Sequence, residues 1–230
     1  MEATVRFIER ISRTPAANSY RFTRPPGFSF QAGQYAIVSL GEEGMLVHPL
    51  SFSDGPQKDY LEFTKRMTGS VYCQYLEGLY PGDRITVKGP IGSFSMRDIV
   101  NDIVYIVGGI GITPIRSMLA EAVHQRDRRR ITLLYGNLND DDIAFSRELA
   151  ELPLPGFRLV HVLQHSWGKV EARQGFITSR IIEEEVTADI QSSTFLVSGP
   201  PAMVKAMEEQ LFLLGVLENQ IRLDRFLGYS

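Results

Sequence analysis

A buried strand that ends in a cluster of glycines constrains this chain more than any other part of its sequence. Residues 103–122 read IVYIVGGIGITPIRSMLAEA, an apolar run followed by three glycines, then Thr113-Pro114, then a helical pattern. Glycine permits positive φ angles and lets a ligand approach the backbone closely, and the start of a helix favours phosphate. The stretch alone leaves two interpretations open: a tight strand-to-helix turn, or a turn that binds a nucleotide.

Strands and helices alternate along the chain from about residue 98 onward. The predicted strands are IVYIVGG, RITLLYGN, FRLVHVLQ and STFLVSGPP, the predicted helices are PIRSMLAEAVHQ, DDIAFSRELAEL, ITSRIIEEEV and AMVKAMEEQLFLLG, and IRLDRFLGY closes the chain. This alternation predicts parallel βαβ units with both faces of the sheet covered. In an open parallel sheet, ligands bind beyond the carboxyl ends of the strands. Three turns meet that description, at 108–114, 135–142 and 198–203.

The first 97 residues read as β structure. Apolar and β-branched runs are separated by turn residues, and they are ATVRFIERIS, SYRFTRP, QYAIVSL, YLEFTKRM and DRITVKGPI. One helix interrupts them at GSVYCQYLEGL, where apolar residues recur at helical spacing. Many short strands predict a small antiparallel barrel. We therefore expect two domains: an antiparallel β-barrel at 1–97, followed at 98–230 by an α/β domain with a Rossmann-like parallel sheet.

Composition limits the chemistry that the side chains can perform by themselves. A net charge of −3 argues against a general nucleic-acid binder, and the run QRDRRR at 125–130 reads as a solvated helix end. Cys73 is the only cysteine, which excludes an internal disulfide or an iron–sulfur cluster. His161 and His165 form only a weak pair, so we expect no metal site. If the chain handles electrons, the carrier is an organic cofactor.

We expect no membrane span and a cytoplasmic protein. No apolar run in the sequence approaches the roughly 20 residues that a membrane helix needs. The first ten residues, MEATVRFIER, contain no apolar stretch of signal length.

Eight motifs, in order along the chain, resemble those of the ferredoxin–NADP reductase superfamily of flavoenzymes. They are FQAGQYAIVSL, HPLSFSD, GSVYCQYL, LYPGDRITVKGPIGSF, VGGIGITPIRSML, YGNLNDDDIAFSREL, VSGPPAMVKAM and DRFLGY. The resemblance implies a barrel that binds FAD and an α/β domain that binds NADH or NADPH. It also implies transfer of a hydride from nicotinamide C4 to flavin N5, and then of electrons to an acceptor.

The resemblance implies a flavin site built around HPLSFSD. The common family pattern there is Arg-x-Tyr-Ser/Thr, and this chain has His48, Leu50 and Ser51 at those positions. A His-Pro-x-Ser/Thr version occurs in members that resemble ferric reductases and NADPH oxidases. The flavin-binding residues implied are His48, Pro49, Leu50, Ser51, Lys65, Gly69, Ser70 and Val71. Alternatives stay open: His48 as a structural strand residue, Ser70 as a helix N-cap and Lys65 as an exposed strand end.

The nicotinamide-binding residues implied by the resemblance lie in the three turns of the second domain. They are Gly108, Gly109, Gly111, Thr113, Pro114, Asn137, Asp142, Gly199, Pro200 and Met203. Met203 is equally well explained as a core residue. Ser198 stands where the family usually has a cysteine near nicotinamide C4, and we expect hydride transfer to survive that change. The residues expected at the reacting rings are Ser51, Thr113, Ser198 and Tyr229, with Phe226 as a rival to Tyr229.

NADH is favoured over NADPH by the loop that follows YGN. Three acidic residues at 140–142 would repel a 2′-phosphate, whereas an acid can accept a hydrogen bond from a 2′-hydroxyl. Arg116, Arg147 or Arg173 can still supply a compensating charge. The expected partner is a redox protein such as ferredoxin, flavodoxin or a haem protein, while a ferric chelate or free flavin stays open. Two alternatives remain: an electron-transfer subunit of a larger complex, and a flavin-binding module that has lost turnover.

Overall fold

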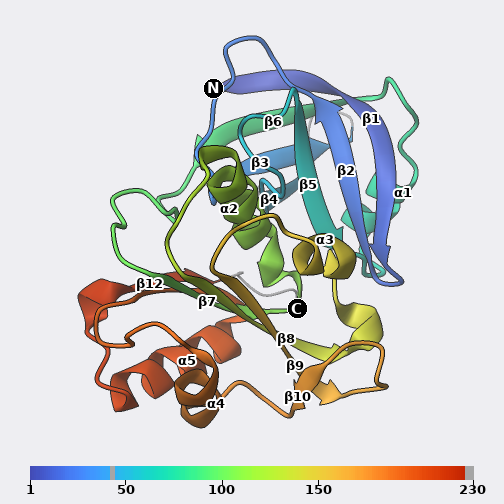
Figure 1. Ribbon diagram of the computed structural model, residues 1–230. Helices are drawn as coiled ribbons and strands as arrows, with labels where there is room; N and C mark the ends of the chain where they lie inside the picture. Colours follow the sequence, from blue (N-terminus) through green and yellow to red (C-terminus); the bar gives the residue numbers. More distant parts are fainter. Residues whose placement is uncertain (42–44, 226–230) are drawn as a thin grey trace. The chain divides into compact units, whose positions relative to one another are not determined.

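The structure is a computed structural model, and it describes residues 1–41 and 45–225 (Figure 1). The chain divides into two compact units. The first comprises Met1–Met96 and Thr113–Glu121, and the second comprises Arg97–Ile112 and Ala122–Ser230. The middle of one helix therefore packs with the first unit although the residues on either side of it belong to the second. Each unit is described by itself below.

The first unit is built on a six-stranded antiparallel sheet with the order β4-β3-β6-β1-β2-β5. Its elements are β1 (Glu2–Thr14), β2 (Ala17–Thr23), β3 (Tyr35–Leu40), β4 (Leu46–Ser51), β5 (Tyr60–Arg66), α1 (Val71–Glu77) and β6 (Arg84–Ile91). An isolated antiparallel bridge between Phe52 and Phe63 joins the end of β4 to β5. The two edge strands thus meet, and the sheet curls on itself as the barrel prediction requires.

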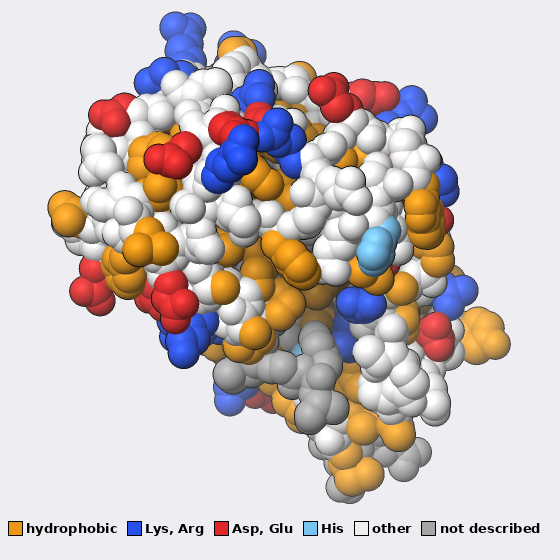
Figure 2. Space-filling model, turned by 90° about the horizontal axis from the view of Figure 1, so that it is seen from below, with side chains coloured by type: hydrophobic (Ala, Val, Ile, Leu, Met, Phe, Trp, Pro, Cys, Tyr) orange, Lys and Arg blue, Asp and Glu red, His pale blue; other side chains and the backbone are white. Residues whose placement is uncertain are grey.

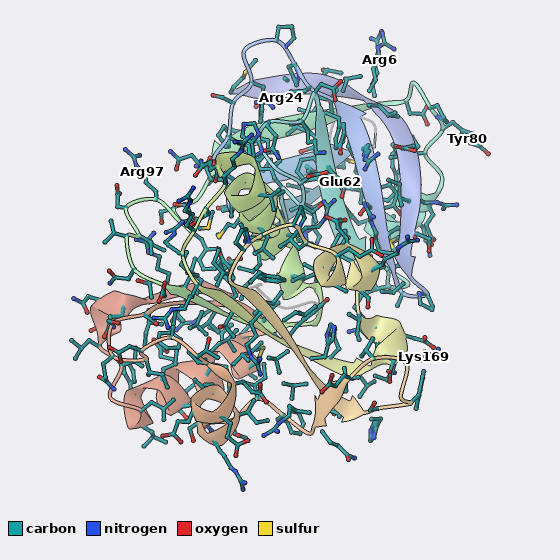
Figure 3. All side chains as sticks on the ribbon, viewed as in Figure 1. Arg6, Arg24, Glu62, Tyr80, Arg97 and Lys169 are labelled. Carbon is teal, nitrogen blue, oxygen red and sulfur yellow. The ribbon has the colours of Figure 1, made fainter. Side chains whose placement is uncertain are left out.

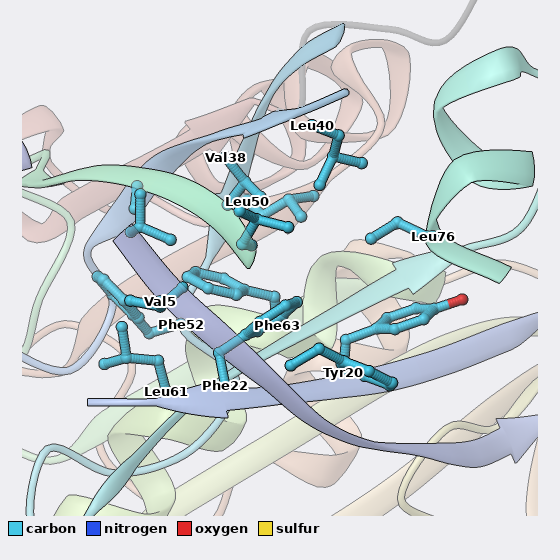
Figure 4. Close-up of a cluster of buried hydrophobic side chains, with 14 of the residues drawn as sticks. Val5, Tyr20, Phe22, Val38, Leu40, Leu50, Phe52, Leu61, Phe63 and Leu76 are labelled. Carbon is cyan, nitrogen blue, oxygen red and sulfur yellow. The ribbon is translucent and has the colours of Figure 1, made fainter. Parts of the chain in front are cut away.

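Alternation along the strands gives this sheet its core. On β3, Ala36, Val38 and Leu40 are buried while the residues between them are partly exposed, which is the period-2 pattern of a sheet with one buried face. Aromatic rings fill the interior (Figure 4): Phe30 stacks on Phe52 at a centroid distance of 4.0 Å, and Phe52 lies 5.2 Å from Phe63. The core is apolar, so the polar residues buried around it require an explanation of their own.

The second unit contains a six-stranded sheet with the order β10-β9-β8-β7-β11-β12, in which all pairs are parallel. Its strands are β7 (Ile103–Gly108), β8 (Ile131–Asn139), β9 (Phe157–His165), β10 (Ala172–Gln174), β11 (Thr194–Gly199) and β12 (Ile221–Arg225). The helices are α2 (Ile112–Gln125), α3 (Ser146–Ala150), α4 (Ser179–Glu185) and α5 (Pro201–Leu213), with short 3₁₀ turns at Gly109–Gly111, Asp140–Asp142 and Glu218–Gln220. Helices α4 and α5 pack in one apolar cluster with side chains of β7, β8, β9 and β11. The two-domain prediction of fold class is confirmed.

The helix predicted at 141–152 is shorter than its sequence pattern indicates. Asp140–Asp142 form a 3₁₀ turn, Phe145 adopts a left-handed φ of 62°, and α3 starts only at Ser146. The Asn139 side chain accepts the Asp141 N–H at 2.9 Å, which satisfies the backbone locally without a helix. The three-residue edge strand β10 is absent from the sequence prediction, because three residues are too few to show a period.

Surface charge is mixed rather than gathered by sign. On the face in Figure 2, basic and acidic side chains are interspersed, as on an ordinary solvated surface. None of the helices formed by residues 1–41 and 45–225 has the length and hydropathy that crossing a membrane requires.

Candidate functional site

The end of β4 presents the residues predicted to meet the flavin. Leu50 is buried in the barrel core, whereas Pro49 is exposed, so Pro49 and not Leu50 offers apolar surface here. Ser51 ends the strand and is 7% exposed. His48 is partly exposed, and its Nδ1 lies 2.9 Å from the Pro49 carbonyl oxygen. When His48 is neutral and donates from Nδ1, its Nε2 carries a lone pair and cannot donate to a phosphate.

Lys65 is not an exposed strand end. Its side chain is 2% exposed, and its Nζ lies 5.8 Å from the centre of the Tyr72 ring, which in turn lies 5.1 Å from the His48 ring. Burial lowers the pKa of Lys65, and burial together with the charge of Lys65 lowers the pKa of His48. Two potential cations therefore share one end of the barrel. A buried arrangement of this kind fits an anionic group such as a phosphate.

The start of α1 shows how Gly69, Ser70 and Val71 are used. Ser70 is the N-cap, and its hydroxyl accepts the Cys73 N–H at 3.3 Å, which confirms the capping interpretation. Tyr72 points inward and donates to the Val38 carbonyl oxygen at 3.3 Å. Nothing lies within 4 Å of the position a Cβ on Gly69 would take, so its backbone faces open space.

Cys73 is buried and its thiol is held by neighbours. The N–H of Thr68 donates to Sγ at 3.4 Å. Burial opposes ionisation of the thiol, but hydrogen bonds from Ser70 and Thr68 and the nearby Lys65 lower its pKa below the ordinary value. The cysteine thus belongs to the same polar cluster as Lys65.

The glycine turn that opened the sequence analysis has two separate structural reasons. A Cβ on Gly111 would lie 2.5 Å from the Ser198 carbonyl oxygen, and one on Gly108 would lie 2.3 Å from the Met203 sulfur. These two glycines allow the turn after β7 to pack against the turn after β11. Gly109 differs, because it has a φ of 52° and nothing within 4 Å of its Cβ position. Gly109 is therefore the glycine that leaves room for a ligand.

Thr113 and Pro114 form the first turn of α2 and are buried. Gly199 and Pro200 link β11 to α5, and Pro200 is the N-cap of that helix. Met203 contacts the Cβ positions of Gly108 and Gly199, so it packs within the turn, in agreement with the core interpretation.

Ser198 has a partner that the sequence analysis did not single out. Its hydroxyl donates to Asp224 Oδ2 at 3.3 Å, and the two residues are paired in register on β11 and β12. Burial raises the pKa of Asp224 to about 6, although the Ser198 hydrogen bond opposes the shift. A carboxyl group that changes charge near neutral pH at the carboxyl end of a strand is a candidate functional group. The sequence offered one signal, because Asp224 is an acid that directly follows Leu223 within the predicted closing segment IRLDRFLGY.

The acidic loop after β8 is mainly structural. Asp140 accepts the backbone N–H groups of Trp167, Lys169 and Val170 at 2.6, 2.9 and 3.2 Å, and these bonds lower its pKa. Asp141 pairs with Lys169 Nζ at 2.5 Å. Lys169 lies in the loop after β9 (Figure 3), so two of the three acids tie that loop down. Among the three acids of this loop, Asp142 is partly exposed, and the described residues show no ion pair for it.

Asn137 is buried at the carboxyl end of β8. Neither Oδ1 nor Nδ2 makes a hydrogen bond among the described residues. Burial raises the pKa of Tyr135 and the Asn137 side chain opposes that rise, so the amide interacts with this phenol although the geometry is not that of a hydrogen bond. His161 is buried beside the Tyr135 ring at 6.1 Å, and burial lowers its pKa. The described residues contain no cluster of three or more metal-ligating side chains.

The three arginines considered as partners of a 2′-phosphate are engaged elsewhere. Arg116 pairs with Asp54 and Glu62, Arg147 with Glu151, and Arg173 with Glu184 and Glu185. Tyr229 and Phe226, the predicted tail aromatics, lie outside the described residues.

Family models match both parts of the chain. Residues 2–96 match the oxidoreductase FAD-binding domain and residues 105–209 match the oxidoreductase NAD-binding domain.

Curated relatives include NADH-cytochrome b5 reductase 1 of Dictyostelium discoideum, 32% identical over 64% of this chain and 53% of its own length. The xylene/toluene monooxygenase electron transfer component of Pseudomonas putida is 32% identical over 86% of this chain and 58% of its own length. This chain thus spans little more than half the length of those two relatives.

Solved structures share the fold. The cytochrome P450 reductase GcoB of Amycolatopsis has a TM-score of 0.87 at 25% identity, covering 98% of this chain and 70% of its own. A ferredoxin NADP⁺ reductase of Neisseria gonorrhoeae with bound FAD and NADP has a TM-score of 0.87 at 21% identity, covering 97% and 98%.

Proposed function

We propose a function for this chain from the fact that it belongs to the ferredoxin–NADP reductase superfamily of FAD- and NAD-binding oxidoreductases. The chain is an NAD(P)H-dependent flavin oxidoreductase that transfers electrons onward to an acceptor. When bound, nicotinamide and flavin supply hydride transfer from C4 to N5 and release of electrons one or two at a time. The protein contributes binding, orientation and local electrostatics.

The observation that carries this proposal is the packing of the glycine turn against Ser198. Gly111 allows the backbone after β7 to approach the Ser198 carbonyl so closely that no side chain fits, while Gly109 faces open space beside it. Both segments lie at the carboxyl ends of parallel strands, where dinucleotides bind in such sheets. Gly109 then admits the dinucleotide, and the Ser198–Asp224 pair offers it a hydrogen-bonding edge.

In the first unit, His48 and Lys65 hold the flavin pyrophosphate, and Ser51 donates to the polar edge of the flavin ring. The support is the position of both side chains beside the Tyr72 ring at one end of the barrel, and the position of Ser51 at the end of β4. Thr113, on the first turn of α2, orients the nicotinamide. These groups act by position, because none of them exchanges electrons itself.

NADH is the favoured reductant. Arg116 is buried and paired with carboxylates, and Arg147 and Arg173 each lie beside a glutamate at the surface, so the charge of all three is at least partly offset. Asp142, the partly exposed acid of the loop after β8, accepts a hydrogen bond from a 2′-hydroxyl and repels a 2′-phosphate.

The acceptor is a redox protein. A second candidate function, an electron-transfer component of a multi-protein oxygenase, has specific support, because the name of the Pseudomonas putida relative describes such a component. A cytoplasmic location is part of the proposal, since one cysteine provides no disulfide for an oxidising compartment.

The test is to purify the protein, add FAD, and follow the flavin band near ~450 nm after addition of NADH or NADPH. We expect FAD to bind and NADH to bleach the band faster than NADPH. Ferredoxin, flavodoxin, cytochrome b5 and ferricyanide are then compared as acceptors. A protein that binds FAD but is bleached by neither nucleotide would be a flavin-binding module without turnover, and would contradict the proposal.

A further inference from the structure

A buried arginine connects α2 to the segment that follows β4. The guanidinium of Arg116, which is 5% exposed, donates to the Ser53 carbonyl oxygen, to Glu62 Oε1 at 2.9 Å and to Asp54 Oδ2 at 3.3 Å. The next residue adds a contact, because the Ser117 hydroxyl donates to the Asp54 carbonyl oxygen at 2.7 Å. All of these residues belong to the first compact unit.

The acceptors of Arg116 are themselves fixed. Glu62 lies inside the first unit, whereas Arg6 and Tyr80 project from its surface (Figure 3). The Glu62 carboxylate also accepts hydrogen bonds from Arg13 Nη2 at 3.1 Å and from Arg21 Nε at 2.8 Å.

Asp54 is held as firmly. It accepts the Tyr60 hydroxyl at 2.7 Å. Burial opposes its ionisation, but the charge of Arg116 and the Tyr60 hydrogen bond lower the pKa of Asp54. Every partner of the Arg116 fork is therefore charged or rigid, and a buried fork on such partners permits little movement.

The sequence spacing gives this network a consequence for the reacting rings. Asp54 follows Ser51 by three residues, and Arg116 follows Thr113 by three residues, which is about one turn of α2. Ser51 and Thr113 are the residues assigned above to the flavin and the nicotinamide. The network thus joins the two short segments that carry them, by contacts within one compact unit.

We propose that Arg116 is a positioning residue that sets the place of Thr113 relative to Ser51, and thereby the approach of the nicotinamide to the flavin. This inference rests on the proposed function. Arg116 touches neither cofactor in this account; it acts through α2. Lysine at this position keeps the charge but has no planar fork to bind three oxygens.

The experiment compares Arg116→Met, Arg116→Lys and a matched control, Arg13→Met, in the full chain. Arg13 donates to the same Glu62 Oε1 as Arg116, but it comes from β1, and its Nε donates to the Ser19 hydroxyl on β2 at 2.7 Å. Three quantities are measured: the Kd for FAD, the limiting rate of flavin bleaching, and the dinucleotide concentration that gives half that rate. Hydrogen exchange of residues 112–118 is also followed in the protein without FAD.

For Arg116→Met we expect a limiting rate about 10- to 100-fold lower, because small misplacement of reacting groups has effects of that size. Its Kd for FAD stays close to that of the wild type, and exchange at 112–118 becomes faster. Arg116→Lys recovers part of the rate. Arg13→Met keeps the wild-type limiting rate, although loss of its ion pair with Glu62 makes the protein less stable.

Equal limiting rates in Arg116→Met and the wild type would overturn the inference, and so would an equal fall in Arg13→Met, which would mean a merely structural role. If Arg116→Met does not fold, Arg116→Lys and Ser117→Ala carry the same comparison with Arg13→Met. A wild-type protein that binds FAD but is not bleached contradicts the proposed function instead. The exchange measurement still shows in that case whether Arg116 immobilises the start of α2.

Discussion

Ser198 and Asp224 are neighbours across β11 and β12, and the Ser198 hydroxyl donates to Asp224 Oδ2 at 3.3 Å. Burial raises the pKa of this carboxyl to about 6. The pair lies beside the glycine turn, since the Ser198 carbonyl is what a Cβ on Gly111 would strike. A group with such a pKa changes charge within the ordinary working range of pH, which makes the stability of the protein sensitive to it.

Asp224 makes the folded state less stable as pH rises. Its folded pKa of about 6 lies above the unfolded value of 3.8. Between these two pH values the native state binds more protons than the unfolded state, so the free energy of unfolding falls as the pH rises through this range. We expect the stability of the wild type relative to Asp224→Asn to fall by up to about 3 kcal/mol from pH 4 to pH 7. Urea unfolding of both proteins across this range measures the effect. A pH-independent difference would show that Asp224 titrates normally.

The glycines at 109 and 111 separate ligand binding from packing. Gly109→Ala costs about 1 kcal/mol of stability, because an L-residue is strained at a φ of 52°. We expect it to weaken NADH binding by about 10-fold or more, equivalent to about 1.4 kcal/mol, since the new Cβ fills the ligand's space. In Gly111→Ala the new Cβ clashes with the Ser198 carbonyl instead, so we expect mainly a lower melting temperature. Equal NADH affinity in Gly109→Ala and the wild type would show that the dinucleotide does not bind at this turn.

His48 is expected to make FAD binding depend on pH. Neutral His48 that donates from Nδ1 to the Pro49 carbonyl has no proton on Nε2 for a phosphate, whereas the protonated ring has one. Because burial lowers the pKa of His48, FAD should bind more tightly, by up to about 10-fold, as the pH falls from about 8 to about 5. FAD titrations by fluorescence quenching measure this. His48→Ala should remove the pH dependence, and a variant that keeps it would assign the effect to another group.

Asp140 is expected to hold the loop after β9 closed. Its carboxylate accepts three backbone N–H groups, whereas Asp141 makes only a surface pair with Lys169. In Asp140→Asn the loop opens and trypsin cuts after Lys169 faster than in the wild type. Asp141→Asn is the matched control and should be cut at nearly the wild-type rate. The hydrogen bonds lower the pKa of Asp140, so their stabilisation is present above its unfolded pKa and is lost as the pH falls through the folded one.

The strands and most helices could be predicted from the sequence because their apolar patterns extend over many residues. The β7 run and the alternation on β3 each bury one clear set of side chains. The helix at 141–152 was predicted too long, because the side chain of Asn139 satisfies the backbone in a way that periodicity cannot reveal. Strand β10 could not be predicted, because three residues are too few to show an apolar repeat.

In the candidate site, the sequence indicates a residue's structural role most clearly where the backbone geometry demands one residue type. Gly109 and Gly111 can be recognised from the sequence, because the first has a positive φ and the second leaves no space for a side chain. Asp224 and Arg116 did not, because their importance comes from partners that are 26 and 54 residues away in the chain, Ser198 and Glu62. Leu50, one of the flavin-binding residues that the resemblance implies, is buried in the barrel core, whereas its neighbour Pro49 is exposed.

Single-turnover reduction of the FAD-loaded protein by NADH, without oxygen and with either hydrogen or deuterium at nicotinamide C4, tests the central claim most directly. The account predicts complete loss of the flavin band near ~450 nm in one turnover, and a slower loss with the deuterated nucleotide. A colourless protein that does not bind added FAD, or a flavin band unchanged by excess NADH and NADPH, would contradict it.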